Sequence, residues 1–266
     1  MTAILETLRR VVFMSDLHME MRGYDPSVFS NVDADLVILA GDIGVGIEGV
    51  RWAQKAFKCP VLYVAGNHEF YRHDFAYLIE DMRDVAAGSN VTILENDAVV
   101  IDGIRFIGST LWTNFKYFGG ELFRPSIMEA DRCMNDFHLI RGSLGPLTPP
   151  ETIDRHEVSR RFLEKEIEAS KEPVVVITHH TPSKVTTATK YELSLLTAAF
   201  TSNLDALIRE PVVAWICGHT HHSGAWRVNG VPVLSNQWGY PSEFSAPFNP
   251  TWTIAAAIES CILNVG

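Results

Sequence analysis

The chain has 266 residues, of which 47% are hydrophobic and 20% are charged, and its formal net charge is -10. These values are typical of a globular protein with one large domain, and they argue against a disordered chain. Its Lys and Arg residues are scattered rather than gathered into a stripe, which argues against binding of extended nucleic acid. A small phosphate compound remains compatible, because bound cations can reverse the local field.

Alternating strands and helices are predicted in the first hundred residues. Runs rich in β-branched residues predict buried strands at 11–14, 36–40 and 61–65. Apolar residues at helical spacing predict helices at 46–57 and 73–87, with a short turn or helix at 25–32. Shorter strands are predicted at 91–94, 98–101 and 104–108, and Asp102-Gly103 predicts a hairpin between the last two.

An irregular insertion from about residue 110 to 150 interrupts this alternation. It is rich in aromatic residues and contains Gly119-Gly120 and Pro149-Pro150. An irregular stretch of that length inside a compact domain is usually either a functional lid or a surface segment. Both interpretations stay open.

The second half repeats the pattern and then changes to hairpins. Helices are predicted at 151–170 and 195–209, and buried strands at 174–177 and 212–217. A hairpin is predicted around Asn229-Gly230, and 253–265 is predicted to be a buried strand. We therefore expect a single α/β domain over 1–266, with two stacked mixed sheets and helices on the outside.

Two further features bear on the compartment. No run approaches the roughly 20 apolar residues of a membrane span, and residues 1–7 lack the basic region of a signal peptide. The four cysteines form no C-x-x-C pair, as expected for reduced thiols: Cys59, Cys133, Cys217 and Cys261. We expect a cytoplasmic protein with no membrane partner.

Asp, Asn and His side chains follow the five long apolar runs. The five motifs are Asp16-Leu17-His18, Gly41-Asp42, Gly66-Asn67-His68-Glu69, His179-His180 and Gly218-His219-Thr220-His221. In open α/β sheets, ligands bind beyond the carboxyl ends of the strands. We therefore expect these side chains to meet at one edge of the sheet. Residues two apart on an extended chain point to the same side, so Asp16 and His18 can bind one ion.

The donor types predict a pair of transition-metal ions. Mixed nitrogen and oxygen donors favour Mn, Fe or Zn, with Co or Ni as alternatives, over Ca or Mg alone. Two ions about 3.5–4 Å apart that share Asp42 account for all the donors. The seven predicted ligands are Asp16, His18, Asp42, Asn67, His179, His219 and His221. We expect His68 to face the substrate, with Glu69 to orient it.

Taken in this order, the motifs D-x-H, G-D, G-N-H-E, H-H and G-H-x-H resemble the calcineurin-like metallophosphoesterase family. They extend from Asp16 to His221. The resemblance implies a four-layer α/β/β/α sandwich and a dinuclear phosphoester hydrolase in which His68 is catalytic. It implies one ion on Asp16, His18, Asp42 and His221, and the other on Asp42, Asn67, His179 and His219. In the H-H motif His179 is favoured as the ligand, with His180 as the alternative.

The wider chain resembles compact bacterial members of this family that are described as predicted phosphohydrolases. The resemblance rests on S-T-L-W-T at 109–113, M-N-D-F at 134–137 and G-Y at 239–240.

We therefore expect a metal-dependent hydrolase of a small phosphodiester or phosphomonoester that uses a metal-bridging hydroxide. The diester is favoured, because the insertion and the loop of Tyr240 are expected to cover a substrate with two arms. Arg132, His138 and Arg141 form a hypothetical phosphate clamp. The alternatives are a non-catalytic metal-binding scaffold of the same fold and a nuclease acting on short oligonucleotides.

Overall fold

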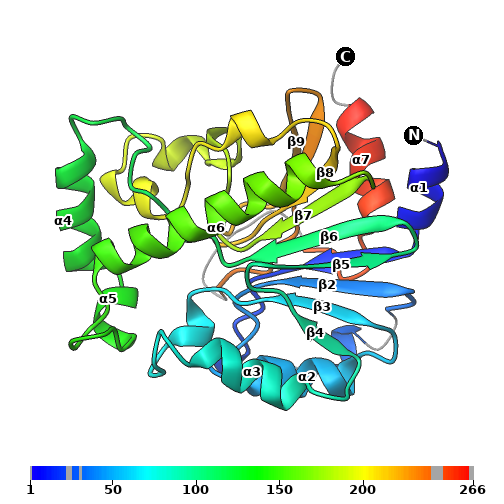
Figure 1. Ribbon diagram of the computed structural model, residues 1–266, viewed down its shortest axis with the longest axis horizontal. Helices are drawn as coiled ribbons and strands as arrows, with labels where there is room; N and C mark the ends of the chain where they lie inside the picture. The colour runs from blue at the N-terminus through cyan, green and yellow to red at the C-terminus, as the bar shows by residue number, and fades with distance from the viewer. Residues whose placement is uncertain (1, 22–25, 30–31, 241–247, 264–266) are drawn as a thin grey trace.

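Two β-sheets packed face to face form the centre of the protein, and helices cover their outer faces (Figure 1). The computed structural model describes residues 2–21, 26–29, 32–240 and 248–263. The predicted 25–32 segment lies partly outside these residues; its described part contains a short 3-10 helix, Pro26–Phe29. The four-layer α/β/β/α architecture is confirmed.

The first sheet has four strands, all parallel. They are β1 (Val11–Met14), β2 (Leu36–Ala40), β3 (Val61–Val64) and β4 (Val91–Ile93), in that spatial order. This sheet is therefore parallel in its described strands, and only the second sheet is mixed. Helices α2 (Glu48–Ala56) and α3 (Leu78–Ala86) lie against its outer face, at the bottom of Figure 1.

The second sheet has six strands in the order β5-β6-β7-β8-β10-β9. Its members are β5 (Asp97–Ile101), β6 (Ile104–Ser109), β7 (Val174–Thr178), β8 (Val212–Ile216), β9 (Gly224–Val228) and β10 (Val231–Ser235). The edge strands β5 and β9 are antiparallel to their neighbours, and the inner four are parallel. Helix α6 (Pro149–Ala169) crosses the outer face of this sheet.

Side-chain alternation along the strands divides the core into three layers. Phe13, Ile38 and Ile177 are fully buried between the two sheets. Their neighbours in sequence point the other way, so Val37 packs toward α2 and α3, and Val176 packs toward α6. Full burial of side chains of this size contributes roughly 1.5–3 kcal/mol each.

Helix α6 begins where its sequence predicts a cap. Thr148 and Glu151 form a capping box, in which the Glu151 carboxylate accepts hydrogen bonds from the Thr148 backbone N–H at 3.0 Å and the Thr148 hydroxyl at 2.7 Å. Pro149 occupies the first helical position, where no backbone N–H is needed. The prediction of a helix in this region is confirmed.

The C-terminal prediction of a strand is wrong, because the segment forms helix α7 (Ile254–Leu263). The buried residues Ile254, Ala257, Ile258 and Cys261 follow the i, i+3, i+4, i+7 spacing of a helix, and the small side chain of Ala255 is buried beside them. The run of alanines from 255 to 257 also favours a helix. Helix α7 packs beside β1, β9 and β10, together with α1 (Thr2–Leu8).

Three other predicted segments differ from the structure. The helix predicted at 195–209 is replaced by two short 3-10 helices, Leu195–Ala199 and Asp205–Leu207, because Thr201 instead pairs with Thr181. The helix predicted from residue 73 begins at Leu78, since the backbone of Phe75 is hydrogen-bonded to Arg141. The insertion at 110–150 is partly helical rather than irregular, with α4 (Phe123–Cys133) and α5 (Asp136–Leu139).

Within the described residues, none of the helices combines the length and the apolar character required to cross a membrane.

Candidate metal centre

The predicted donors come together at the carboxyl ends of both sheets. The loops after β1, β2 and β3 carry Asp16 and His18, Asp42, and Asn67, and the loops after β7 and β8 carry His179, His219 and His221. The expectation of a single sheet edge is therefore corrected. The two sheets stack so that the ends of their parallel strands lie on the same side of the molecule, and the donors meet between them.

Most of these donors have a backbone conformation that L-residues rarely adopt. The φ angle is positive at Asp16 (54°), His18 (46°), Asp42 (55°), His219 (71°) and His221 (49°). Such residues cost roughly 1–3 kcal/mol each and are concentrated at functional sites, where the surrounding structure fixes them. The backbone of the loops after β1, β2 and β8 therefore adopts an uncommon conformation at the residues whose side chains form the candidate centre.

Two glycines leave the room that the donors occupy. A Cβ atom at Gly41 would overlap the ring of His179, and one at Gly66 would overlap the carboxylate of Asp42. Gly41 also has a φ of 89°, which L-residues avoid. The G-D and G-N-H-E motifs thus need glycine for close packing of the donor side chains.

One cluster of donor atoms surrounds His18. Its Nε2 atom lies 2.9 Å from Nε2 of His221, 3.9 Å from Oδ2 of Asp42 and 4.0 Å from Oδ1 of Asp16. The His221 Nε2 atom is 3.5 Å from the same Asp16 oxygen. These four side chains thus point to one position.

A second cluster surrounds His179. Its Nε2 atom lies 3.0 Å from Oδ1 of Asn67, 3.1 Å from Nδ1 of His219 and 3.4 Å from Oδ1 of Asp42. The two carboxylate oxygens of Asp42 therefore face different clusters. This is the arrangement expected of a carboxylate that bridges two ions.

The donor sets fit metal ions chemically. Bonds of ~2.0–2.2 Å to one ion place neighbouring ligand atoms roughly 3–4 Å apart. The distances given above are 2.9–4.0 Å in the first cluster and 3.0–3.4 Å in the second. Nδ1–H of His179 donates to the Ala40 carbonyl at 2.9 Å, which leaves the Nε2 lone pair directed into the cluster. Asn67 donates its amide N–H to Asp136 at 2.9 Å, which directs its carbonyl oxygen inward.

Burial and charge perturb the titration of this cluster strongly. Burial lowers the pKa of His179, but the Asp42 carboxylate overcomes it and raises that pKa to about 9. Burial raises the pKa of Asp42, yet His179 and His68 bring it well below its usual range. Burial and two neighbouring histidines hold the pKa of His219 well below its usual range, so its ring is neutral, as a metal ligand requires.

His68 is held at both ring nitrogens. Its Nδ1 atom lies 2.7 Å from Oε1 of Glu20, and its Nε2 atom lies 3.0 Å from the Tyr240 hydroxyl. Burial lowers the pKa of His68, but Asp42 and Glu20 raise it to a net value above its usual range. Sequence reasoning missed Glu20; its signal is the continued i, i+2 spacing of Asp16, His18 and Glu20.

The sequence predicts that Glu69 orients His68, but in the structure Glu69 has other partners. The carboxylate is fully buried and accepts five hydrogen bonds, four of them from backbone N–H groups of the loops that carry Asp42 and Asn67. These hydrogen bonds come from the backbone N–H groups of Asp42, Ile43, Gly44 and Gly66 and from the hydroxyl of Tyr63. Glu69 therefore ties two donor loops together.

Asp136 is a second residue that sequence reasoning missed, although it lies in the M-N-D-F motif. It accepts hydrogen bonds from Asn67 and from the Tyr71 hydroxyl, each at 2.9 Å. It is buried at the start of α5. The insertion therefore contributes to the centre by holding Asn67 in place.

The two histidines of the H-H motif have different surroundings. The ring of His179 lies in the second cluster, whereas Nδ1 of His180 lies 3.1 Å from the Thr110 carbonyl oxygen. Burial and the neighbouring His179 hold the pKa of His180 well below its usual range. The geometry favours His179 as the donor.

The proposed phosphate clamp is not assembled. Arg132, His138 and Arg141 are exposed and lie outside the lining of the cavity above the donors. Arg132 instead pairs with Glu129 at 2.8 Å, and Nε2 of His138 faces the Arg132 carbonyl at 3.3 Å. Of the predicted substrate residues, only Tyr240 lines the cavity.

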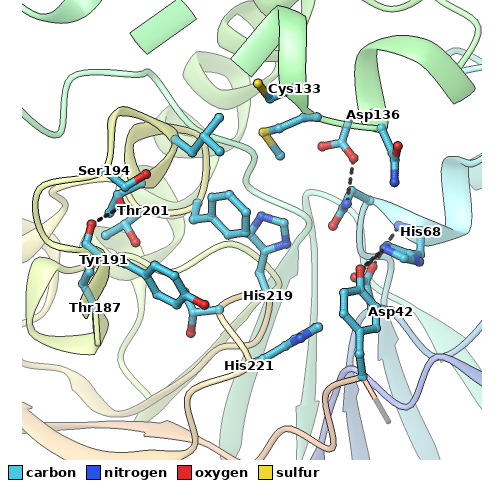
Figure 2. A pocket seen from close by; sticks show the side chains of 18 of the residues that line it. Asp42, His68, Cys133, Asp136, Thr187, Tyr191, Ser194, Thr201, His219 and His221 are labelled. Carbon is cyan, nitrogen blue, oxygen red and sulfur yellow. Dashed lines mark hydrogen bonds and ion pairs between the residues drawn. The ribbon is translucent and has the colours of Figure 1, made fainter. Parts of the chain in front are cut away.

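A cavity of about 340 Å³ opens above the donors. Figure 2 shows Tyr191, Ser194 and Thr201 on one side and His68 and Asp136 on the other, with His219 and His221 at its base. Four of the predicted ligands line it, namely Asp42, Asn67, His219 and His221, so a small molecule can reach this side of the centre. The 187–201 segment and the α4–α5 turn form the walls.

Comparison with known proteins identifies the family of the chain and proteins that share its fold. Residues 9–223 match a family model described as calcineurin-like phosphoesterase. An uncharacterised protein of Acanthamoeba polyphaga mimivirus is 30% identical over 207 residues, 71% of each chain. The crystal structure of phosphopantetheinyl hydrolase from Mycobacterium tuberculosis superposes with a TM-score of 0.73 at 19% identity, covering 92% of this chain and 95% of that one. The structural likeness shows a shared fold.

Proposed function

This chain belongs to the calcineurin-like phosphoesterase family, and we propose that it is a dinuclear metal-dependent hydrolase of a small phosphodiester. The observation that carries the proposal is the division of the seven donors into two clusters that share Asp42. In this proposal one ion is held by Asp16, His18, Asp42 and His221, and the other by Asp42, Asn67, His179 and His219. Mn, Fe or Zn suits these donors best.

When bound, two such ions would lower the pKa of a water and neutralise charge on the phosphoryl oxygens. A water that has released one proton to solvent attacks phosphorus as hydroxide while the P–O bond to the leaving group breaks, and the leaving oxygen takes the proton that His68 carries on Nε2. Glu20 accepts the hydrogen bond of Nδ1–H, which keeps the imidazole oriented and favours its protonated form. The Tyr240 hydroxyl, 3.0 Å from Nε2, lies beside the leaving group.

We favour a phosphodiester over a phosphomonoester because the cavity continues past the donors between two walls, which provides space for a second ester arm. A nuclease fits less well, since the described residues that line the cavity include no Lys or Arg. A non-catalytic scaffold fits less well, because the donors and His68 are all in place beneath an open cavity.

The four cysteines are free, which supports a cytoplasmic location.

The test is hydrolysis of bis(p-nitrophenyl) phosphate by the protein reconstituted with Mn²⁺. We expect metal-dependent hydrolysis that falls by at least ~100-fold in His68→Ala while bound metal is retained. His138→Ala is the matched control, because that histidine is exposed and lies outside the cavity. The proposal is contradicted if this diester is not hydrolysed with any of Mn²⁺, Fe²⁺, Co²⁺, Ni²⁺ or Zn²⁺, and hydrolysis of p-nitrophenyl phosphate alone would favour a phosphomonoesterase instead.

A further inference from the structure

Apart from His68 and Asp136, the described walls of the cavity are neutral, although its base is built from ionisable groups. The 187–201 wall offers hydroxyl groups and apolar surface, and the opposite wall offers an amide and a thioether. The wall residues that matter here are Thr187, Ser194, Leu196, Thr197, Met134 and Asn135. Among the described lining residues, the only carboxylates are those of Asp42 and Asp136, and none is Lys or Arg.

Three charged side chains in or beside these walls already have partners. Arg132, next to the lining residue Cys133, pairs with Glu129 on α4 at 2.8 Å. The ammonium group of Lys190 lies over the ring of Tyr191, 4.7 Å from its centre. Asp136 accepts hydrogen bonds from Asn67 and Tyr71. The described walls therefore present no free cation to an anionic group of a ligand.

We infer that the cavity accepts a phosphoester whose remaining arm is uncharged, with amide or hydroxyl groups and an apolar part, and that it discriminates against a second phosphate or a carboxylate. The inference rests on the proposed function. An anionic arm would lose its hydration on entering the cavity and gain no partner from the walls. A neutral amide would exchange its water for the hydroxyl groups of Ser194 and Thr197.

Charge balance at the base supports the same inference. If two divalent ions are bound, Asp16 and Asp42 would neutralise half of their charge. A hydroxide nucleophile and the single negative charge of a diester phosphoryl group would neutralise the rest, and the Glu20 carboxylate would balance the charge of a protonated His68. No excess positive charge then remains to attract a further anion to the walls.

The test uses two p-nitrophenyl phosphodiesters that differ in one group. Their second alcohol is 3-hydroxypropionamide or 3-hydroxypropionate, so the arms have the same shape and differ in charge. We expect kcat/KM to be at least ~10-fold higher for the amide. Binding of the corresponding methylphosphinates, in which carbon replaces both ester oxygens so that no bond can be hydrolysed, is expected to show the same preference when measured by calorimetry. Equal or tighter binding of the carboxylate would overturn the inference.

A variant pair tests the wall directly. Ser194→Lys adds a cation to the wall, and Ser194→Met adds a chain of comparable length without charge. We expect only the lysine variant to shift the preference toward the carboxylate, by ~10-fold or more, and an unchanged ratio in both would overturn the inference. If bis(p-nitrophenyl) phosphate is hydrolysed but the two arms are equivalent, the inference fails and the proposed function stands. If no diester is hydrolysed, the proposed function fails, and calorimetry still decides the inference.

Discussion

Replacement of Glu69 by Gln tests how the donor loops are held together. The Oε1 atom of Glu69 accepts three hydrogen bonds and Oε2 accepts two, from backbone N–H groups at 2.7–3.3 Å and from the Tyr63 hydroxyl. Gln has the same shape, but one of its two terminal atoms is an N–H donor. In either orientation of the amide, at least two buried backbone N–H groups face this donor and lose their acceptor.

The magnitude follows from those two groups. A buried donor that loses its partner costs about 1–3 kcal/mol, so Glu69→Gln should lower the free energy of unfolding by about 2–6 kcal/mol. The affinity for metal should fall about 10–100-fold, since the loops that carry Asp42 and Asn67 are no longer tied together. Burial and the Asp42 carboxylate raise the pKa of Glu69, so the comparison belongs at about pH 8, where the carboxylate is ionised.

Urea denaturation in EDTA measures the first quantity, and Mn²⁺ titration of the folded protein measures the second. Glu80→Gln is the control, because that side chain is 70% exposed on α3 and pairs only with Arg83 among the described residues. A loss of stability below about 1 kcal/mol together with unchanged Mn²⁺ affinity would refute the assignment of Glu69 as the tie between the loops.

Three further predictions follow from single contacts. Glu20→Gln should lower kcat about 10–100-fold with little change in KM in the metal-saturated protein, because His68 loses the carboxylate at its Nδ1; steady-state kinetics beside Glu80→Gln checks this, and an unchanged kcat would contradict it. Asp136→Ala should weaken binding of one ion about 10–100-fold by releasing the Asn67 amide, measured by Mn²⁺ titration beside the exposed Asp131→Ala; equal affinities would exclude the role. Burial lowers the pKa of His156, so its imidazole is protonated less readily in the folded protein than in the unfolded chain. The free energy of unfolding in EDTA should therefore fall as the pH drops below about 6.5, and it should fall more steeply than in His156→Phe. Parallel pH profiles of the two proteins would contradict a contribution from protonation of His156.

Much of the fold was predictable because its strongest signals are local. Each of the five long apolar runs became a buried strand, since parallel strands covered on both faces are apolar throughout. The hairpin turns at Asp102-Gly103 and Asn229-Gly230 also formed, because these residues accept positive φ. The C-terminal segment was misassigned because an apolar run alone does not distinguish a buried helix from a buried strand.

The meeting of the predicted metal ligands was predictable for the same reason, because each lies within five residues after the end of a strand. The groups that orient them were not. Glu20 reaches His68 and Asp136 reaches Asn67 across separations of 48 and 69 residues, and nothing local to Glu69 shows that it bonds to backbone rather than to His68. The hypothesis of a phosphate clamp had a related weakness. A position inside the insertion does not determine whether the side chains of Arg132, His138 and Arg141 face the cavity or the solvent.

The most direct test of the central claim is the rate of bis(p-nitrophenyl) phosphate hydrolysis measured against the number of Mn²⁺ ions bound per chain in the same samples. A dinuclear centre predicts a rate that lags behind the first ion, rises with the second and reaches its plateau at two ions per chain. Asp42→Ala should then reach no comparable plateau, because the shared carboxylate is missing. Full activity at one ion per chain, or none at two, would contradict the account.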